Sequence, residues 1–213
     1  MPTQNTQKIR SKRHNLVLRV AKGHFATSHS HINYYIDIAK QKSRLSEAKA
    51  VAKQLARSYA SNTAVDTILC LEGMTLIGAC LAEELTREGY QSINEHQDIF
   101  VVEPEYNSNN QIIFRDNIQP IITNKRVLVL MASVTTGRTA DRSLEAVGYY
   151  GGTVVGVASM YSAVDSIGQV AVKSIYSLDD LPDYESYNYK DCPMCKAGRK
   201  IDALVNSFGY SCI

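Results

Sequence analysis

Residues 126–139 read RVLVLMASVTTGRT, an almost unbroken apolar run that ends in a turn rich in threonine and glycine. The apolar part, 126–131, is too short for a helix and apolar at successive positions, which predicts a strand buried on both faces. A predicted helix, 140–149, and a second strand, 153–158, follow it. Strand, helix and strand at these spacings form a βαβ unit, so we predict an α/β fold in which a parallel sheet is flanked by helices and 127–131 is an inner strand.

The same order of elements occurs earlier in the chain. Residues 45–59 place alanine, valine and leucine on one helical face, 65–71 form a short β-rich apolar run, and 75–87 again have a helical pattern. The segments 99–102 and 111–114 flank Glu-Tyr-Asn-Ser-Asn-Asn, which indicates a hairpin or a loop between two strands. We find no internal repeat and no interdomain linker in the sequence, so we predict one domain over residues 1–213.

The composition is that of an ordinary globular protein. The 213 residues are 45% hydrophobic and 21% charged, and a chain of this length buries roughly 70% of its extended surface on folding. The net charge of +2 gives no strong attraction to nucleic acid. A basic cluster near the start fits a solvated helix face or a terminal segment better than a DNA-binding arm. It comprises Lys8, Arg10, Lys12, Arg13 and His14.

The sequence offers no sign of a membrane or secreted protein. No apolar run approaches the roughly 18 residues of a membrane span, and the polar start MPTQNTQKIRSKR lacks an apolar signal segment. The five cysteines are an odd number, and Cys70 and Cys80 lie in apolar stretches, which favours reduced thiols over a disulfide scaffold. We expect a cytoplasmic protein that binds neither nucleic acid nor membrane.

The turn Ser133–Thr139 is the most informative candidate site. In open parallel sheets ligands bind beyond the carboxyl ends of the strands, where the next helix presents free N–H groups. Gly137 lets backbone amides approach an anion, and the threonine hydroxyls add donors for phosphate oxygens. Taken alone, the same residues also fit a threonine-capped helix start.

Four segments resemble a known family. VLVLMASVTTGRT is similar to the signature of type I phosphoribosyltransferases, in which a buried strand, two acidic residues and two further residues precede Thr-Thr-Gly-x-Thr. The other three resemble the orotate phosphoribosyltransferase branch and lie in its order along nearly the whole chain. They are Lys22–Phe25 with Thr27, Ser28 and Tyr34–Asp37; Asp66–Glu84; and Cys192–Gly198.

This resemblance implies a core of about 45–175, a small hood formed by about 1–44 and 176–213, and a homodimer. The family joins phosphoribosyl pyrophosphate, a small-molecule ligand, to a pyrimidine base with the help of magnesium, which would be the cofactor if this chain is catalytic. The resemblance also implies three groups of site residues. They are Thr135, Thr136, Gly137, Arg138 and Thr139 for the ribose 5′-phosphate; Thr27, Ser28, Tyr34 and Tyr35 beside the base; and Glu72, Gly73, Met74 and Thr75 on the pyrophosphate side.

Two departures from the family pattern concern the chemistry. The two carboxylates that bind the ribose hydroxyls are replaced by Met131 and Ala132, whose side chains accept no hydrogen bond. The loop that carries cations over pyrophosphate corresponds to 100–107, where Glu103 and Glu105 would repel that anion. Arg138, which stands where the family has glycine, could contact phosphate or face solvent.

Two functions of different class therefore compete. The first is an enzyme related to orotate phosphoribosyltransferase, with an altered substrate or with other acids in the missing roles. Those acids are Glu103, Glu105, Asp116 and Asp141. The second is a non-catalytic sensor of a nucleotide or of phosphoribosyl pyrophosphate.

Cysteine and histidine residues give weaker signals. Cys192 and Cys195 have the spacing of zinc ligands, but a closed site needs four, and Cys212 is the evident third. Two reduced thiols in a tight turn are the simpler interpretation, so we predict no metal site. His24, His29 and His31 are interpreted as a polar loop in which His24 packs beside Phe25.

Overall fold

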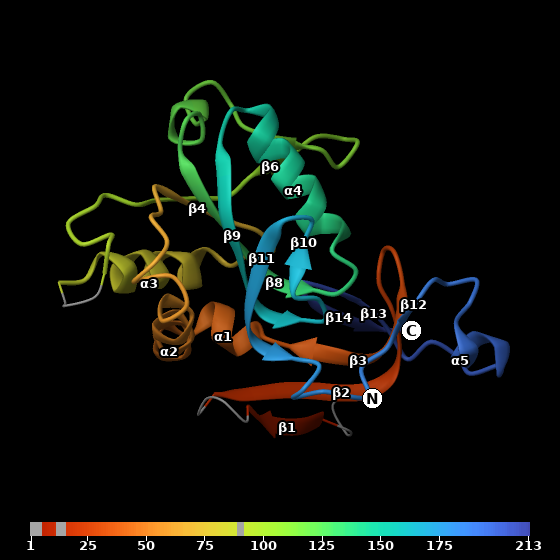
Figure 1. Ribbon diagram of the computed structural model, residues 1–213. Coiled ribbons are helices and arrows are strands. Elements are labelled where there is room, and N and C mark those ends of the chain that lie inside the picture. The colour runs from red at the N-terminus through yellow and green to blue at the C-terminus, as the bar shows by residue number, and fades with distance from the viewer. Residues whose placement is uncertain (1–5, 12–15, 89–91) are drawn as a thin grey trace. The chain divides into compact units, whose positions relative to one another are not determined.

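The computed structural model describes residues 6–11, 16–88 and 92–213 (Figure 1). Contacts divide the chain into two compact units: unit 1 is Met1–Lys40 with Tyr176–Ile213, and unit 2 is Gln41–Ile175. In the described part of the chain, no helix is long and apolar enough to cross a bilayer.

Unit 2 is built on a parallel sheet whose inner strand is the apolar run. The strand order is β10-β11-β9-β8-β4-β5, and β5, β4, β8 and β9 are parallel neighbours. β8 lies between β4 and β9, and its residues 127–131 are at most 1% exposed, so the predicted inner strand is confirmed. The strands are β4 (Thr67–Cys70), β5 (Phe100–Val102), β8 (Arg126–Val134), β9 (Thr153–Ser162), β10 (Ser166–Ile167) and β11 (Val170–Ser177).

Helices cover both faces of this sheet, as predicted (Figure 1). Alternate β8 residues Val129 and Met131 belong to one apolar cluster with Val147 of α4 (Arg138–Tyr149). On the other face α3 (Thr75–Thr86) approaches so closely that a Cβ added to Gly78 would lie 2.3 Å from Cys70 Sγ. Because alternate residues of a strand point to opposite faces, one set of β8 side chains faces the α4 side of the sheet and the other set faces the α3 side. The remaining helices are α1 (Ala39–Ser43), α2 (Leu45–Ala56) and the short 3₁₀ helix η2 (Gln119–Ile121).

The predicted element boundaries differ in places from the structure. β8 and β9 continue to Val134 and Ser162, past the ends expected from their apolar runs, because both stay hydrogen-bonded there. The expected hairpin is also different: β5 joins the main sheet, and the hairpin strands are β6 (Glu105–Tyr106) and β7 (Ile112–Ile113).

Unit 1 joins the first and last parts of the chain in one sheet, with order β12-β3-β2-β13-β14 and β1 beside β2. β13 pairs parallel to β2 through Ala203↔Phe25 and Leu204↔Ala26. Lys8 and Arg10 lie exposed on β1, so the predicted helix face is wrong for them; Lys12, Arg13 and His14 lie outside the described residues. The elements are β1 (Thr6–Arg10), β2 (Val17–Ala26), β3 (His31–Asp37), β12 (Ser186–Tyr187), α5 (Pro193–Lys196), β13 (Ala203–Asn206) and β14 (Gly209–Cys212).

Candidate functional site

The turn between β8 and α4 has the backbone form of an anion site. Gly137 caps α4 with φ 77° and ψ −8°, the left-handed region that favours glycine, and makes no side-chain cap because it has none. A Cβ at this position would lie 2.6 Å from Cδ1 of Ile167. The backbone angle therefore favours glycine here, and any other residue would also displace the end of the Ile167 side chain.

Donors converge at this turn. The first-turn N–H groups of Arg138, Thr139 and Ala140 precede the first intrahelical bond, which Asp141 N–H donates to Gly137 O at 2.8 Å. Among the described residues, none hydrogen-bonds to the hydroxyls of Thr135, Thr136 or Thr139. The side chains of Thr136, Arg138 and Thr139 are exposed, and Thr135 is partly exposed. The turn therefore offers amide and hydroxyl donors at a helix N-terminus, where an anion is favoured.

The residues before this turn belong to the interior. Met131 is 1% exposed and packs in the α4-side apolar cluster, and Ala132 is 3% exposed. Neither offers an oxygen atom to a ribose hydroxyl.

Glu72 fills part of this region with a carboxylate from elsewhere in unit 2. Its Oε2 accepts N–H bonds from Ala132 at 2.9 Å and from Ser133 at 3.4 Å. Glu72 itself has φ 59°, an uncommon left-handed conformation, and Lys42 Nζ donates to its backbone carbonyl at 2.6 Å. Burial raises the pKa of the Glu72 carboxyl, while the two amide bonds and Lys42 act in the opposite direction.

The pyrophosphate-side residues frame the start of α3. Glu72 and Gly73 are both left-handed, the latter at φ 72°, and Met74 is fully buried as the residue before the helix. Thr75 Oγ1 donates a hydrogen bond to the Glu103 carboxylate. An acidic side chain of this chain therefore lies beside the first residue of α3.

Glu105 does not act as the free negative charge expected from the sequence. Arg115 binds both of its carboxylate oxygens, Nε donating to Oε2 at 2.7 Å and the second guanidinium nitrogen to Oε1. This partner lowers the pKa of the Glu105 carboxyl. The pairing follows from the β6–β7 hairpin, which places Glu105 opposite Ile113, two residues before Arg115. The repulsion of pyrophosphate by Glu103 and Glu105 stays a prediction, and the Arg115 partner offsets the negative charge of Glu105.

The other two acids considered as replacements lie before η2 and in the first turn of α4. Asp116 accepts a 3.2 Å hydrogen bond from Gln119 Nε2, and Asp141 lies exposed in the first turn of α4.

The four base-side residues all lie in unit 1. Tyr34 and Tyr35 are buried on β3, where Lys22 Nζ lies 5.4 Å from the Tyr34 ring centroid and Tyr210 packs edge-on against Tyr35 at 5.5 Å. Burial, Asp37 and Tyr210 raise the pKa of Tyr35 to about 12, so its hydroxyl stays protonated at neutral pH. Thr27 Oγ1 closes a local turn by donating to Ser30 O at 2.9 Å, and Ser28 is exposed.

The histidine and cysteine predictions need the largest correction. His24 and His31 do not form a polar loop: they lie on β2 and β3, and their ring nitrogens gather with the sulfurs of Cys192 and Cys195 within 4.8 Å of one another. Cys212, the third ligand considered from the sequence, is exposed on β14 and lies outside this group.

Curated relatives named orotate phosphoribosyltransferase match most of the chain. The protein from Chlorobaculum parvum is 27% identical over 183 residues, which cover 85% of this chain and 86% of that protein. The protein from Caldanaerobacter subterraneus subsp. tengcongensis is 26% identical over 183 residues, covering 84% and 86%. No family model matches the chain.

Solved phosphoribosyltransferase structures share the fold. Orotate phosphoribosyltransferase from Aeropyrum pernix has a TM-score of 0.53 at 19% identity, covering 76% of this chain and 92% of that one. Adenine phosphoribosyltransferase from Thermoanaerobacter pseudethanolicus has a TM-score of 0.51 at 14% identity, covering 83% and 97%. The chain has the type I phosphoribosyltransferase fold, and its sequence is similar to the orotate branch.

Proposed function

We propose that this chain binds a phosphoribosyl or nucleotide ligand of the orotate phosphoribosyltransferase type, with the 5′-phosphate at residues 135–139. We further propose that it transfers the phosphoribosyl group to a pyrimidine-type base only slowly. The sequence similarity to orotate phosphoribosyltransferases over most of the chain supports the ligand class.

One observation carries the phosphate assignment. Gly137 holds a left-handed conformation at the N-terminus of α4, with threonines on both sides whose hydroxyls no described residue occupies. Amides of a helix start together with hydroxyl donors match the oxygens of a phosphate monoester.

Slow transfer follows from the residues that would hold the ribose and the leaving group. A charge-assisted hydrogen bond contributes about 1.5–3 kcal/mol, so two missing ribose carboxylates cost roughly a hundredfold to ten-thousandfold in transition-state affinity. Glu72 occupies the Ala132 amide, and Glu103 on Thr75 places negative charge on the pyrophosphate side. That charge would raise the energy of a bound pyrophosphate.

Magnesium does not fit the ribose side of this site. Met131 and Ala132 supply no oxygen ligand, and the Glu72 carboxylate already accepts two backbone N–H bonds. The proposed binding therefore rests on the amide and hydroxyl donors of the turn and assigns no step to the metal.

Calorimetry with uridine or orotidine monophosphate tests the phosphate assignment. Thr135→Ala removes one donor and should weaken binding roughly 10- to 150-fold. Gly137→Val should abolish binding, because a β-branched residue disfavours the left-handed φ of 77° on which the turn depends. Gly148→Val is the matched control, since an added Cβ at Gly148 of the same helix meets no atom within 4 Å. Unchanged affinity in both turn variants would place the anion elsewhere.

A turnover assay tests the second part of the proposal. Orotidine monophosphate formation from orotate and phosphoribosyl pyrophosphate should be at least about 100-fold slower than in an orotate phosphoribosyltransferase assayed beside it. Turnover at the rate of that enzyme would contradict slow transfer. Monophosphate binding with no turnover would favour the non-catalytic sensor. The observation that supports a sensor is the replacement of both ribose-binding carboxylates by Met131 and Ala132.

A further inference from the structure

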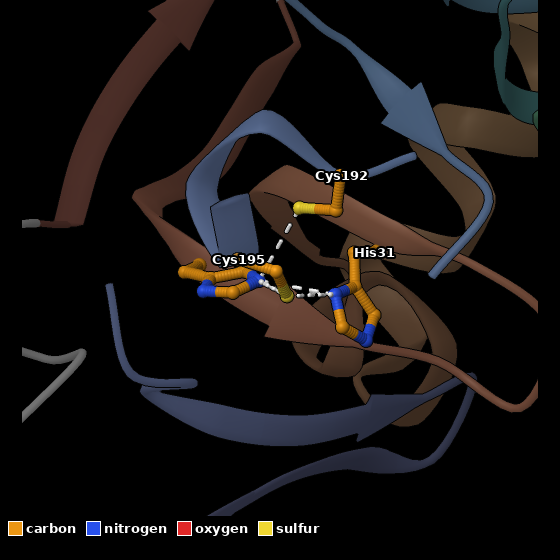
Figure 2. Close-up of side chains that lie close together, drawn as sticks. His31, Cys192 and Cys195 are labelled. Atoms are coloured by element: carbon orange, nitrogen blue, oxygen red, sulfur yellow. Dashed lines mark hydrogen bonds between the residues drawn. The ribbon is translucent and has the colours of Figure 1, made fainter. Parts of the chain in front are cut away.

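We propose that His24, His31, Cys192 and Cys195, here called the His–Cys cluster, bind one structural Zn²⁺ ion. All four residues belong to unit 1, so the site is complete within one compact unit. Figure 2 shows the labelled side chains of His31, Cys192 and Cys195 turned toward one another. The inference does not depend on the proposed nucleotide binding.

The local fold brings the four ligands together from distant parts of the chain. His24 lies near the end of β2 and His31 opens β3, and the antiparallel pairing Ala26↔His31 closes the turn between them. Cys192 is the residue before α5, and Cys195 is within this one-turn helix. The C-x-x-C spacing on a tight turn is common among structural zinc sites.

The distances between ligand atoms fit a single tetrahedral ion. Zn–S bonds of about 2.3 Å and Zn–N bonds of about 2.05 Å predict S···N separations of about 3.6 Å and N···N separations of about 3.3 Å. Cys192 Sγ and Cys195 Sγ lie 3.5 and 3.6 Å from His24 Nε2. Cys195 Sγ lies 3.2 Å from His31 Nδ1, and the two ring nitrogens are 3.1 Å apart. Each of these four separations is within about 0.4 Å of the tetrahedral value.

A second set of contacts orients the His24 ring for metal binding. His24 Nδ1 lies 2.9 Å from Arg199 O and 3.1 Å from Lys200 O, so it carries the proton and donates to these carbonyls. Nε2 is then the unprotonated nitrogen, and its lone pair points into the cluster. The backbone of His24 is fixed as well, because its N–H donates to the Asp202 carboxylate at 2.7 Å and its carbonyl accepts from Asp202 N–H at 2.8 Å.

The turn that carries the two cysteines is also held by backbone bonds. Lys196 N–H donates to Cys192 O at 3.1 Å, Gly198 N–H to Cys195 O at 2.9 Å, and Arg199 N–H to Met194 O at 2.9 Å. Gly198 takes the left-handed conformation, φ 72°, that ends this turn. The same turn thus presents both sulfurs and the Arg199 carbonyl that orients His24.

The donor set selects zinc and a structural role. Two thiolates with two imidazoles in tetrahedral arrangement suit Zn²⁺, whereas magnesium and calcium prefer oxygen ligands. Four protein ligands leave no open position for a substrate, which distinguishes a structural from a catalytic site. Two thiolates also neutralise the ion, so His24 and Cys192 can remain fully buried.

Metal analysis of the purified 213-residue chain tests the site. We expect one zinc per chain, and visible d–d bands with a thiolate charge-transfer band when Co²⁺ replaces it. Cys195→Ser and His31→Ala should weaken zinc affinity on the order of 100-fold or more. Cys195 is exposed, so its serine variant should fold and remain measurable.

Matched controls separate a specific site from general thiol or imidazole binding. Cys212→Ser and His29→Ala change exposed residues outside the cluster, so both variants should keep one zinc per chain. A chelator should lower the unfolding temperature of the wild type and of these controls but not of Cys195→Ser. Wild-type protein that takes up no zinc from a stoichiometric supply, or that forms a Cys192–Cys195 disulfide instead, would overturn the proposal. Equal zinc affinity of Cys195→Ser and Cys212→Ser would overturn it too.

Discussion

Replacing Met131 and Ala132 with aspartate would supply the two carboxylates that type I phosphoribosyltransferases have at these positions. We expect this double variant to form no more orotidine monophosphate than the wild type. Met131 is 1% exposed and packs with Val129 and Val147. Truncating a buried methionine costs about 2–5 kcal/mol of unfolding free energy, before any cost of burying a charge. For a domain of this size, 1 kcal/mol corresponds to about 2–4 °C, so the unfolding temperature should fall by roughly 4–20 °C.

Charge around Ala132 limits activity even in molecules that stay folded. The Ala132 N–H already donates to the Glu72 carboxylate, so an aspartate at 132 places a second acid beside it. Like charges at this separation disfavour each other's ionised form and repel a pyrophosphate group. Adding Glu72→Gln removes one of these charges while its amide oxygen can still accept the backbone bond, so the triple variant should unfold at a higher temperature than the double variant.

The assay combines thermal unfolding with orotidine monophosphate formation at saturating phosphoribosyl pyrophosphate. Met131→Leu is the volume-conserving control and should cost less than about 1.5 kcal/mol. Turnover of the double variant near that of an orotate phosphoribosyltransferase, with an unchanged unfolding temperature, would refute the reasoning on both counts.

Three further predictions concern stability. Hydrogen bonds from Arg126 lower the pKa of Asp66 to about 2, so their ion pair stabilises the fold above pH 4 and is lost as the pH falls from about 4 to 2. In Asp66→Asn, the free energy of unfolding should therefore change less over this pH range than in the wild type. Gly78→Ala should lower the unfolding temperature, because its added Cβ meets Cys70 Sγ, and a further Cys70→Ala change should recover part of the loss. If the losses in stability of the two single variants simply add in the double variant, the contact is contradicted. Tyr59→Phe removes a buried 2.9 Å hydrogen bond to a β9 carbonyl and should cost about 1 kcal/mol in denaturant unfolding; no measurable loss would contradict that role.

The sequence predicted the features that depend on neighbours along the chain. The inner strand β8, the helices α3 and α4 and the glycine turn before α4 follow from local apolar periodicity and from a threonine- and glycine-rich segment. The Glu105–Arg115 pair was missed, although a correct hairpin register would have shown it.

Two other features depend on contacts between residues that are far apart in the sequence. The Glu72 carboxylate reaches the Ala132 amide across 60 residues, and this contact needs an uncommon left-handed backbone at Glu72. The His–Cys cluster joins residues about 170 positions apart. The C-x-x-C half was visible in the sequence, but its partners could be found only from the strands that carry His24 and His31.

The mixed origin of the unit 1 sheet has a consequence during synthesis on the ribosome. The β2–β3 hairpin is translated early, whereas β13, which pairs with β2, begins only at Ala203. At about 5–20 residues per second, roughly 9–35 s pass between the end of β2 and the arrival of its neighbour. β1 pairs with residues 17–21 of β2, so throughout this interval only the end of that edge, at Phe25 and Ala26, has unpaired backbone groups that can join a strand of another chain. The duration of this exposure is set mainly by the time needed to translate unit 2, which separates the two parts of the sheet in the sequence.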